Sequence, residues 1–258
     1  MTTTETENLS SEEIPTLIKH VKMPSRLFNF VNPANPTSKV LELEVTPLFP
    51  TPFAKVKIPI EYYKYFPMLM QEPVKPIEKT TTHLYSYNNY VLNLSKYKEL
   101  KNFIQTATQS FLGEVLMIKG KSRITQSWLN QNGPGHHTHT HIHPNSIVSG
   151  VLYVQTTKEN GFIKFHKAGG LNNGNDYSWS MAPTQYENVP QDNPYSWGNF
   201  SVGVETGDLI MFPSYFTHSV PKNETQDDRW SLAYNSVTHD AIGDDEMLTH
   251  LPCEERSI

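Results

Sequence analysis

The sequence has a single cysteine, Cys253, among its 258 residues, so no internal disulfide can form and no thiolate cluster is available to a metal. It also lacks any apolar run of about 18 residues, the length that a membrane helix needs. Basic residues are few, since 21 Lys and Arg stand against 26 Asp and Glu and the formal net charge is -5. No basic stretch is long enough to follow a nucleic-acid backbone. These absences argue against a disulfide scaffold, a membrane protein and a nucleic-acid-binding protein.

The first 15 residues, MTTTETENLSSEEIP, are polar and acidic and predict a disordered tail. They lack the basic and apolar regions of a signal peptide, which together with the lone cysteine favours a cytoplasmic protein. Residues 16–258 are enough for one large domain, and we expect a single domain with a helical and proline-rich N-terminal flank. Residues 40–76 contain seven prolines and predict edge strands and loops, with strands at Leu41–Val45 and Phe53–Ile58.

Hydrophobic periodicity predicts one long helix over about Lys96–Met117, where Leu100, Ile104 and Phe111 recur at helical spacing. Short β-rich runs, separated by Gly, Asn, Pro and Asp, follow the helix at Ser122–Leu129, Ile147–Gln155, Phe162–Phe165, Ser201–Val204, Leu209–Phe212 and Trp230–Val237. This succession is typical of an antiparallel sandwich or jelly roll. The segment Ala168–Asn199 has no clear periodicity, and we expect it to border the substrate rather than to form part of the barrel.

A histidine-rich segment is the strongest chemical feature of the sequence. In HHTHTHIHP the histidines alternate with other residues at His137, His139, His141 and His143. Alternate side chains of an extended strand point to one face, so neighbouring members of this set can bind one metal ion. A loose, adventitious metal site is the alternative for such a run. Further along the chain, an apolar strand feeds a loop that carries His218, and the sequence RWS then places Arg229 and Ser231 on one strand face.

The order of these motifs resembles that of the iron(II), 2-oxoglutarate-dependent oxygenases, and most closely the branch with a His-x-His-Pro-x-Ser motif. The resemblance covers about Ser127–Val237 and rests on His-x-His-Pro-x-Ser, GVLYV, GFIKF, GDLIMFPS, an isolated histidine and Arg-x-Ser. It implies a mainly β double-stranded β-helix, or jelly roll, which the long helix would buttress. It also implies that Fe(II) binds to His141, His143 and His218, and that Arg229 with Ser231 holds the distal carboxylate of 2-oxoglutarate.

Chemistry favours the same roles. Iron(II) that binds a bidentate 2-oxo acid and still admits dioxygen needs three protein ligands on one face of the metal. A carboxylate inside a barrel needs a fixed cation, which Arg229 can supply, although a salt bridge with Asp227 or Asp228 is the alternative for that arginine. Tyr153 can hydrogen-bond the co-substrate or fill the core. Trp128 can line the pocket, although we expect it in the core. His139 is the reserve metal ligand, because a shift of two positions leaves the histidines on the same face.

One departure from the superfamily concerns the third ligand, which is usually Asp or Glu. Neither residue occurs between Gln131 and Thr157. A third neutral histidine leaves the site more positive, so zinc, nickel and cobalt become candidates beside iron. The expected reaction is hydroxylation of a protein side chain or a small molecule, with release of succinate and carbon dioxide. Two alternatives stay open, a cupin-like three-histidine metalloenzyme that does not use 2-oxoglutarate and a non-catalytic metal-binding β-sandwich. A homodimer is also compatible with the sequence.

Overall fold

The structure is a computed structural model that describes residues 26–30, 41–45, 50–77, 80–166, 199–238, 242–243 and 246–249. The predicted tail, residues 1–15, and the predicted loop up to residue 198 lie outside these ranges, so both stay predictions. The predicted single domain from residue 16 onward also stays a prediction. No helix in the described ranges is long and apolar enough to cross a membrane.

The chain divides into two compact units, Met1–Pro50 and Thr51–Ile258. The described part of the first unit is a pair of antiparallel strands, β1 (Arg26–Phe30) and β2 (Leu41–Val45). The second unit contains every element described below, including all residues of the candidate site.

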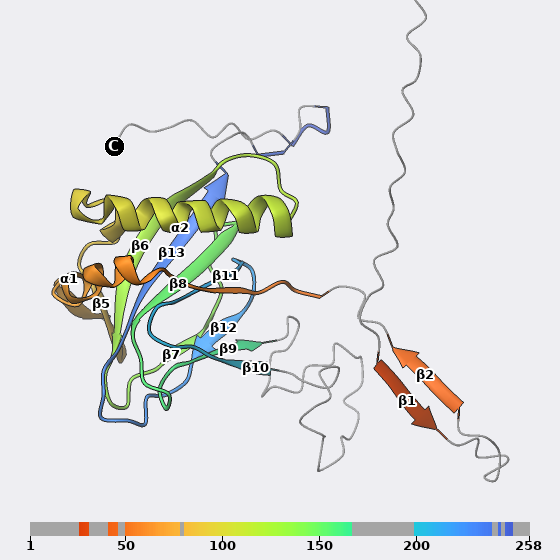
Figure 1. Cartoon of the computed structure of the whole chain (residues 1–258), viewed down its shortest axis with the longest axis horizontal. Helices are drawn as coiled ribbons and strands as arrows, with labels where there is room; N and C mark the ends of the chain where they lie inside the picture. The colour runs from red at the N-terminus through yellow and green to blue at the C-terminus, as the bar shows by residue number, and fades with distance from the viewer. Residues whose placement is uncertain are drawn as a thin grey trace, which may run out of the picture. The chain divides into compact units, whose positions relative to one another are not determined.

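Two antiparallel sheets form the framework of the second unit (Figure 1). Their strands are β3 (Ala54–Lys57), β4 (Val74–Ile77), β5 (Thr80–Ser86), β6 (Ser122–Asn132), β7 (Thr138–His141), β8 (Val148–Gln155), β9 (Phe162–His166), β10 (Asn199–Gly203), β11 (Asp208–Pro213), β12 (His218–Val220) and β13 (Arg229–Thr238). The larger sheet has the order β3-β11-β8-β13-β6-β5-β4 and the smaller sheet the order β10-β9-β12-β7. The six β-rich runs that the sequence predicts after the helix correspond to β6, β8, β9, β10, β11 and β13. The predicted jelly-roll class is therefore confirmed.

Helical segments precede β6 and cover one face of the larger sheet. They are the 3-10 helices η1 (Ile60–Tyr65), η2 (Val91–Asn93) and η3 (Ser95–Tyr97), the α-helices α1 (Phe66–Leu69) and α2 (Lys98–Ser110), and a π-helical turn, η4 (Phe111–Val115). Figure 1 shows α2 lying across β6, β13 and β8. The predicted helix over about Lys96–Met117 is thus confirmed, with a 3-10 beginning and a π-helical end. Its buried residues Leu100 and Ile104 join one core with Leu129, Leu152 and Leu232 of the sheet.

A second, smaller core lies between the two sheets. Ile163 and Phe165 of β9 alternate with the half-buried Lys164, as expected for a strand with one face inward. They pack with Ile210 and Phe212 of β11 in the larger sheet. Aromatic contacts fix this layer, since the rings of Phe165 and Phe212 meet edge to face with centroids 5.1 Å apart. This core holds the smaller sheet, which carries two of the site histidines, against the larger one.

Candidate metal centre

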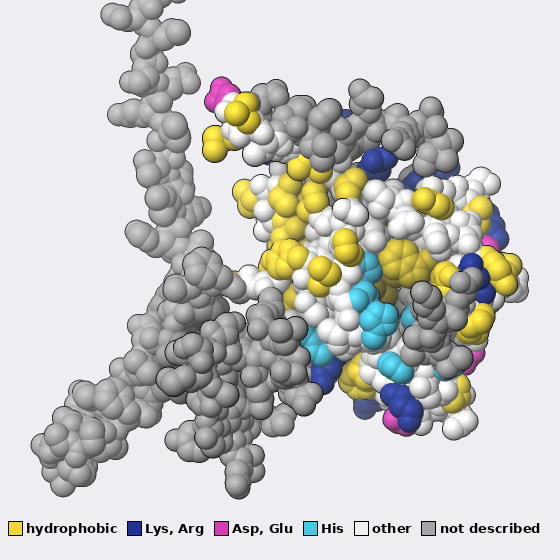
Figure 2. Space-filling model, turned by 180° about the vertical axis from the view of Figure 1, so that it is seen from behind, with side chains coloured by type: hydrophobic (Ala, Val, Ile, Leu, Met, Phe, Trp, Pro, Cys, Tyr) yellow, Lys and Arg dark blue, Asp and Glu magenta, His cyan; other side chains and the backbone are white. Residues whose placement is uncertain are grey.

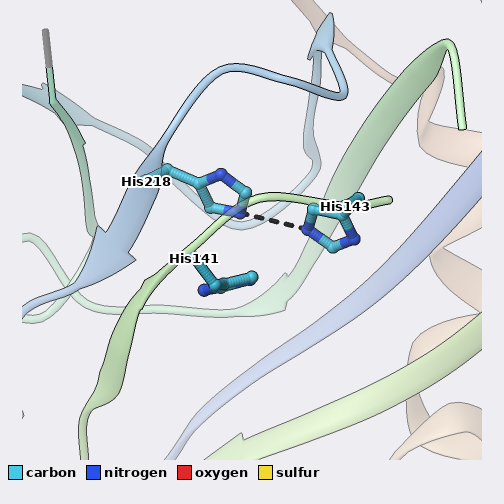
Figure 3. A group of neighbouring side chains, drawn as sticks. All are labelled: His141, His143 and His218. Atoms are coloured by element: carbon cyan, nitrogen blue, oxygen red, sulfur yellow. Dashed lines mark hydrogen bonds between the residues drawn. The ribbon is translucent and has the colours of Figure 1, made fainter. Parts of the chain in front are cut away.

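Three histidines converge where β7 meets β12. His141 ends β7, His143 follows two residues later, and His218 begins β12. The pairing of these strands sets His218 directly opposite His141. One ring nitrogen of each of the three side chains lies within 4.8 Å of the others, and Figure 3 shows the three rings grouped together. The strand pairing therefore brings residues 75 positions apart, His143 and His218, into one group.

The spacing of the ring nitrogens suits a metal ion. Nε2 of His143 lies 3.2 Å from Nε2 of His218. Bonds from histidine nitrogen to a first-row metal are about 2.1 Å long, so two such bonds at a right angle place their nitrogens about 3.0 Å apart. The separation is thus close to that of two adjacent ligands in an octahedral site. The donor set, three imidazoles without a carboxylate in the group, fits Fe(II) and also fits zinc, nickel or cobalt.

Hydrogen bonds on the outer side of two rings determine which nitrogen faces inward. Nδ1 of His141 lies 2.8 Å from the carbonyl oxygen of His139, and Nδ1 of His218 lies 2.8 Å from that of Phe216. A carbonyl oxygen can only accept, so each Nδ1 carries the hydrogen and donates it. In a neutral ring this leaves the lone pair on Nε2, which in His218 is the atom that faces His143.

The third ring, that of His143, is held by a side chain instead of a backbone carbonyl. It forms a hydrogen bond with the side chain of Asn235. The oxygen Oδ1 of Asn235 also accepts a hydrogen bond of 2.9 Å from the hydroxyl of Ser149. That hydroxyl lies 2.8 Å from the hydroxyl of Ser214, whose carbonyl oxygen accepts a hydrogen bond from the backbone N–H of His143. The buried hydroxyls of Ser149 and Ser214 thus orient the side chain of Asn235, which in turn orients the ring of His143.

Burial keeps the three rings neutral. Desolvation, reinforced by the neighbouring histidine His141, lowers the pKa of His143 to about 4 and that of His218 to about 3. Desolvation also lowers the pKa of His141. At neutral pH all three lone pairs are therefore available to a metal without the loss of a proton.

The three histidines line a cavity of about 240 Å³. Figure 2 shows histidine side chains gathered on one face of the molecule, beside hydrophobic side chains. The floor of the cavity consists of cross-strand pairs between β13 and β6, namely Arg229 with Asn132, Ser231 with Asn130 and Ala233 with Trp128. Successive pairs share one face because they are two residues apart, and each step along the strands covers roughly 7 Å.

The three cross-strand pairs extend along the cavity from Arg229 toward the histidine group. The ring of Trp128, in the last of the three pairs, stacks on the ring of His143 with a centroid separation of 5.7 Å. Trp128 therefore lines the cavity beside the candidate metal centre, and the expectation that it belongs to the core was wrong. Arg229 lies in the first pair, four residues and roughly 13 Å along β13 from the pair at the tryptophan.

Arg229 is almost completely buried, with 3 % of its surface exposed. Its Nη1 donates to the carbonyl oxygens of Asn160, at 3.2 Å, and Phe162, at 2.8 Å. Its Nε has no hydrogen-bond partner in the described part of the chain. No described carboxylate forms an ion pair with Arg229. The neighbouring Asp228, which was the alternative partner, accepts a hydrogen bond from Gln131. Burial lowers the pKa of Arg229, but a guanidinium stays charged, so the cavity contains an uncompensated positive charge.

The other predicted co-substrate residues lie beside this arginine. Ser231 and Tyr153 are cross-strand partners on β13 and β8, and both line the cavity. The guanidinium carbon of Arg229 lies 6.0 Å from the centroid of the Tyr153 ring. Burial raises the pKa of Tyr153 to about 12, so its hydroxyl remains a hydrogen-bond donor at neutral pH. The structure thus brings all six predicted site residues to one cavity.

The reserve ligand His139 also lines the cavity, with its ring centroid 5.6 Å from that of His141, but it does not belong to the group of three. Two further lining residues, His83 and Asn132, were missed by the sequence reasoning. His83 comes from β5, and its ring hydrogen-bonds the backbone of His137. The sequence around His83 gives no signal for this role. Asn132 could have been found, because it shares its strand face with Trp128 and Asn130.

The described geometry agrees with a family comparison. Residues 126–235 match the family model described as a putative 2OG-Fe(II) oxygenase, a range that contains all the residues of the histidine group and the arginine. This segment belongs to the 2OG-Fe(II) oxygenase superfamily. The match thus supports a 2OG-Fe(II) oxygenase-type enzyme, and Fe(II) and 2-oxoglutarate are the cofactors of that superfamily.

Solved structures show the same fold. The non-heme alpha-ketoglutarate-dependent carbocyclase SnoK from nogalamycin biosynthesis is 14% identical, with a TM-score of 0.53 over 80% of this chain and 90% of that chain. The alpha-ketoglutarate-dependent epimerase SnoN from the same biosynthesis is 13% identical, with a TM-score of 0.52 over 74% of this chain and 80% of that chain. A search of curated proteins finds no match. At these identities the two likenesses concern the oxygenase fold and leave the reaction and the substrate open.

Proposed function

We propose that this oxygenase is a hydroxylase that oxidises a protein side chain or a small molecule, while 2-oxoglutarate and dioxygen yield succinate and carbon dioxide. The observation that carries the proposal is the content of one cavity. Its wall holds three neutral histidines with converging nitrogens, and its floor holds a buried arginine without a carboxylate partner. A 2-oxo dicarboxylic acid matches both ends, because one carboxylate and the oxo group can bind a metal while the other carboxylate compensates the arginine.

In this proposal His141, His143 and His218 hold Fe(II) through Nε2. When bound, the metal supplies the redox chemistry with dioxygen. The protein contributes the fixed tautomers of His141 and His218, the amide of Asn235 that orients His143, and the ring of Trp128 that stacks on His143. Three neutral ligands leave the charge of the metal uncompensated by the protein, which favours an anionic co-substrate.

Arg229, Ser231 and Tyr153 bind the distal carboxylate of 2-oxoglutarate in the same proposal. Nη1 of the arginine is tied to two backbone carbonyls, so the guanidinium is fixed before the co-substrate arrives. Its unpaired Nε is then a donor for one carboxylate oxygen. A buried cation without a counter-ion is costly, and a bound carboxylate removes that cost.

The primary substrate has room in a wider groove of about 690 Å³. The groove continues from the cavity, because Thr138, His139 and Val220 line both. An exposed side chain of a protein, or an extended small molecule, fits an approach of this kind. The net charge of -5 disfavours nucleic acid as the substrate. A cytoplasmic location remains part of the proposal, supported by the single cysteine.

One observation favours a second candidate, the cupin-like three-histidine enzyme, because the histidine group contains no carboxylate. That enzyme would have no use for Arg229. The deciding experiment is a calorimetric titration of 2-oxoglutarate into the Fe(II)-loaded protein under nitrogen, with metal-free protein and His218→Ala as controls. We expect one equivalent to bind, and only when the metal is present. Absence of binding, or equal binding without metal, would reject the proposed function in favour of the cupin-like enzyme.

A further inference from the structure

A second side chain at the arginine end of the cavity is buried without partners. Asn132, at the end of β6, has 1 % of its surface exposed, and neither Nδ2 nor Oδ1 has a hydrogen-bond partner in the described part of the chain. Its backbone is satisfied, since its carbonyl oxygen accepts a hydrogen bond of 2.9 Å from Nδ2 of Asn223. Native proteins rarely bury an amide that bonds to nothing, because its lost hydration is not replaced. The unpaired amide therefore indicates that a polar group is absent from this place.

The position of Asn132 in the sheet identifies its neighbour. Antiparallel pairing sets Asn132 directly opposite Arg229, so their Cβ atoms are about 5 Å apart on the same face. Both residues line the cavity, and Nε of Arg229 is unpaired as well. Three polar atoms without partners thus belong to two adjacent side chains. A single ligand group can contact both.

The chemistry of these atoms selects the ligand group. A cationic group is excluded by the charge of Arg229, and a neutral group would leave that charge uncompensated. A carboxylate has two oxygens, each of which accepts more than one hydrogen bond. One oxygen can accept from Nε of Arg229 and the other from Nδ2 of Asn132. The oxygen Oδ1 of Asn132 is then left to accept a guanidinium N–H that the carboxylate does not use.

We propose that Asn132 binds the distal carboxylate of 2-oxoglutarate together with Arg229, an inference that rests on the proposed function. Asn132 then acts as a specificity-determining residue. It strengthens the binding of 2-oxo acids that carry a second carboxylate and does nothing for those that lack one. The pair of Asn132 and Arg229 closes the end of the cavity far from the histidines, so it recognises only the far end of the co-substrate.

The test compares two acids in two variants. Asn132→Leu keeps the approximate shape of the side chain and removes the amide, and Asn102→Leu makes the same change at an exposed position of α2. The probes are 2-oxoglutarate and 2-oxobutyrate, which has the same 2-oxo acid head but no distal carboxylate, titrated into Fe(II)-loaded protein under nitrogen. We expect Asn132→Leu to weaken 2-oxoglutarate about tenfold or more and to leave 2-oxobutyrate and metal affinity unchanged. Asn102→Leu should bind both acids as the wild type does.

The possible outcomes separate the role of Asn132 from the proposed function. If Asn132→Leu binds 2-oxoglutarate as tightly as wild type, or loses affinity for both acids equally, the role of Asn132 is refuted while the proposed function stands. If the wild type itself shows no metal-dependent binding of 2-oxoglutarate, the proposed function fails first. Should the Leu variant not fold, Asn132→Asp replaces it, because a carboxylate at this position would pair with Arg229 and compete with the co-substrate. Wild-type affinity in a folded Asp variant would overturn the inference.

Discussion

Nε2 of His143 and Nε2 of His218 face each other across 3.2 Å. Nδ1 of His218 donates to the carbonyl oxygen of Phe216, so its Nε2 accepts, and in the metal-free protein Nε2 of His143 donates the hydrogen bond that joins the two rings (Figure 3). A metal bound by both nitrogens would replace this hydrogen, because the neutral ring of His143 can carry its proton on Nδ1 instead. The fold therefore holds two ligand nitrogens at a spacing that suits a metal, and this arrangement exists only in the folded chain.

A bound metal should accordingly stabilise the protein. At a metal concentration of about 100 times Kd, the gain is about 2.7 kcal/mol, which for a chain of this size raises Tm by roughly 5 to 10 °C. Thermal unfolding with Fe(II) or Mn(II) under nitrogen, against protein treated with a chelator, measures the shift. His218→Ala is the control and should show no metal-dependent gain. An unchanged Tm in the wild type would mean that the group does not hold a metal.

Single alanine substitutions at His137, His139, His141 and His143 test the register of the histidine segment. We expect the last two to lose the metal, because their rings belong to the converging group, and the first two to retain full stoichiometry. The measurement is metal content after gel filtration in the presence of one equivalent of Fe(II). Full occupancy in His143→Ala, with loss in His139→Ala, would shift the ligand set by two residues toward the reserve ligand.

The sequence predicted this register only in part, for a physical reason. Alternation puts His139, His141 and His143 on one face, but it cannot say which of them meets a partner from another strand. The pairing of β7 with β12 decides this, because it sets His141 opposite His218. The strands of the jelly roll could be predicted because each is marked by a short apolar run in the sequence itself, without knowledge of its partner strand. The position of β5 between β4 and β6 could not be predicted, because it depends on pairing between strands distant in the sequence. The prediction therefore missed that His83, on β5, lines the cavity.

Arg229→Ala should weaken 2-oxoglutarate by roughly 10- to 150-fold, the range for loss of a hydrogen bond to a charged group, and should leave the affinity for Fe(II) nearly unchanged. Arg229→Lys should recover only part of the loss, because an ammonium supplies the charge without the planar donor set. Both variants also lose the bonds from Nη1 to the carbonyls of Asn160 and Phe162, so Tm has to be measured beside the affinity. Wild-type affinity in a folded Ala variant would place the co-substrate elsewhere.

Asn235 offers a test of ligand orientation at a residue that does not belong to the histidine group. Its side chain bonds the ring of His143 and is itself held by Ser149. Loss of such an outer partner typically costs 10- to 100-fold in metal affinity, and we expect Asn235→Ala to fall in that range. Asn235→Asp keeps an acceptor for the ring and should retain most of the affinity. A competition titration with a metal-binding dye measures both. Equal affinities of wild type and Asn235→Ala would show that the backbone alone orients His143.

The stability of the metal-free protein should depend on pH in a defined direction. Burial, as the largest cause, lowers the pKa of His83 and His143 from 6.5 to about 4 and that of His218 to about 3. Below pH 6.5 the unfolded chain binds protons at these positions, whereas the folded chain does not until the pH approaches 4 or 3. The unfolded state therefore gains protons as the pH falls, and the free energy of unfolding decreases through this window. Above pH 6.5 the contribution of the three rings is complete and constant.

Thermal unfolding of metal-free protein at about pH 7.5, 6.5, 5.5 and 5 measures the effect, at values where few carboxylates titrate. His218→Gln, which has no titrating ring, should flatten the decline between pH 6.5 and 5. A wild-type Tm that is the same at pH 5 and pH 7 would contradict the neutral, buried state of these histidines, and with it the ready supply of lone pairs to a metal.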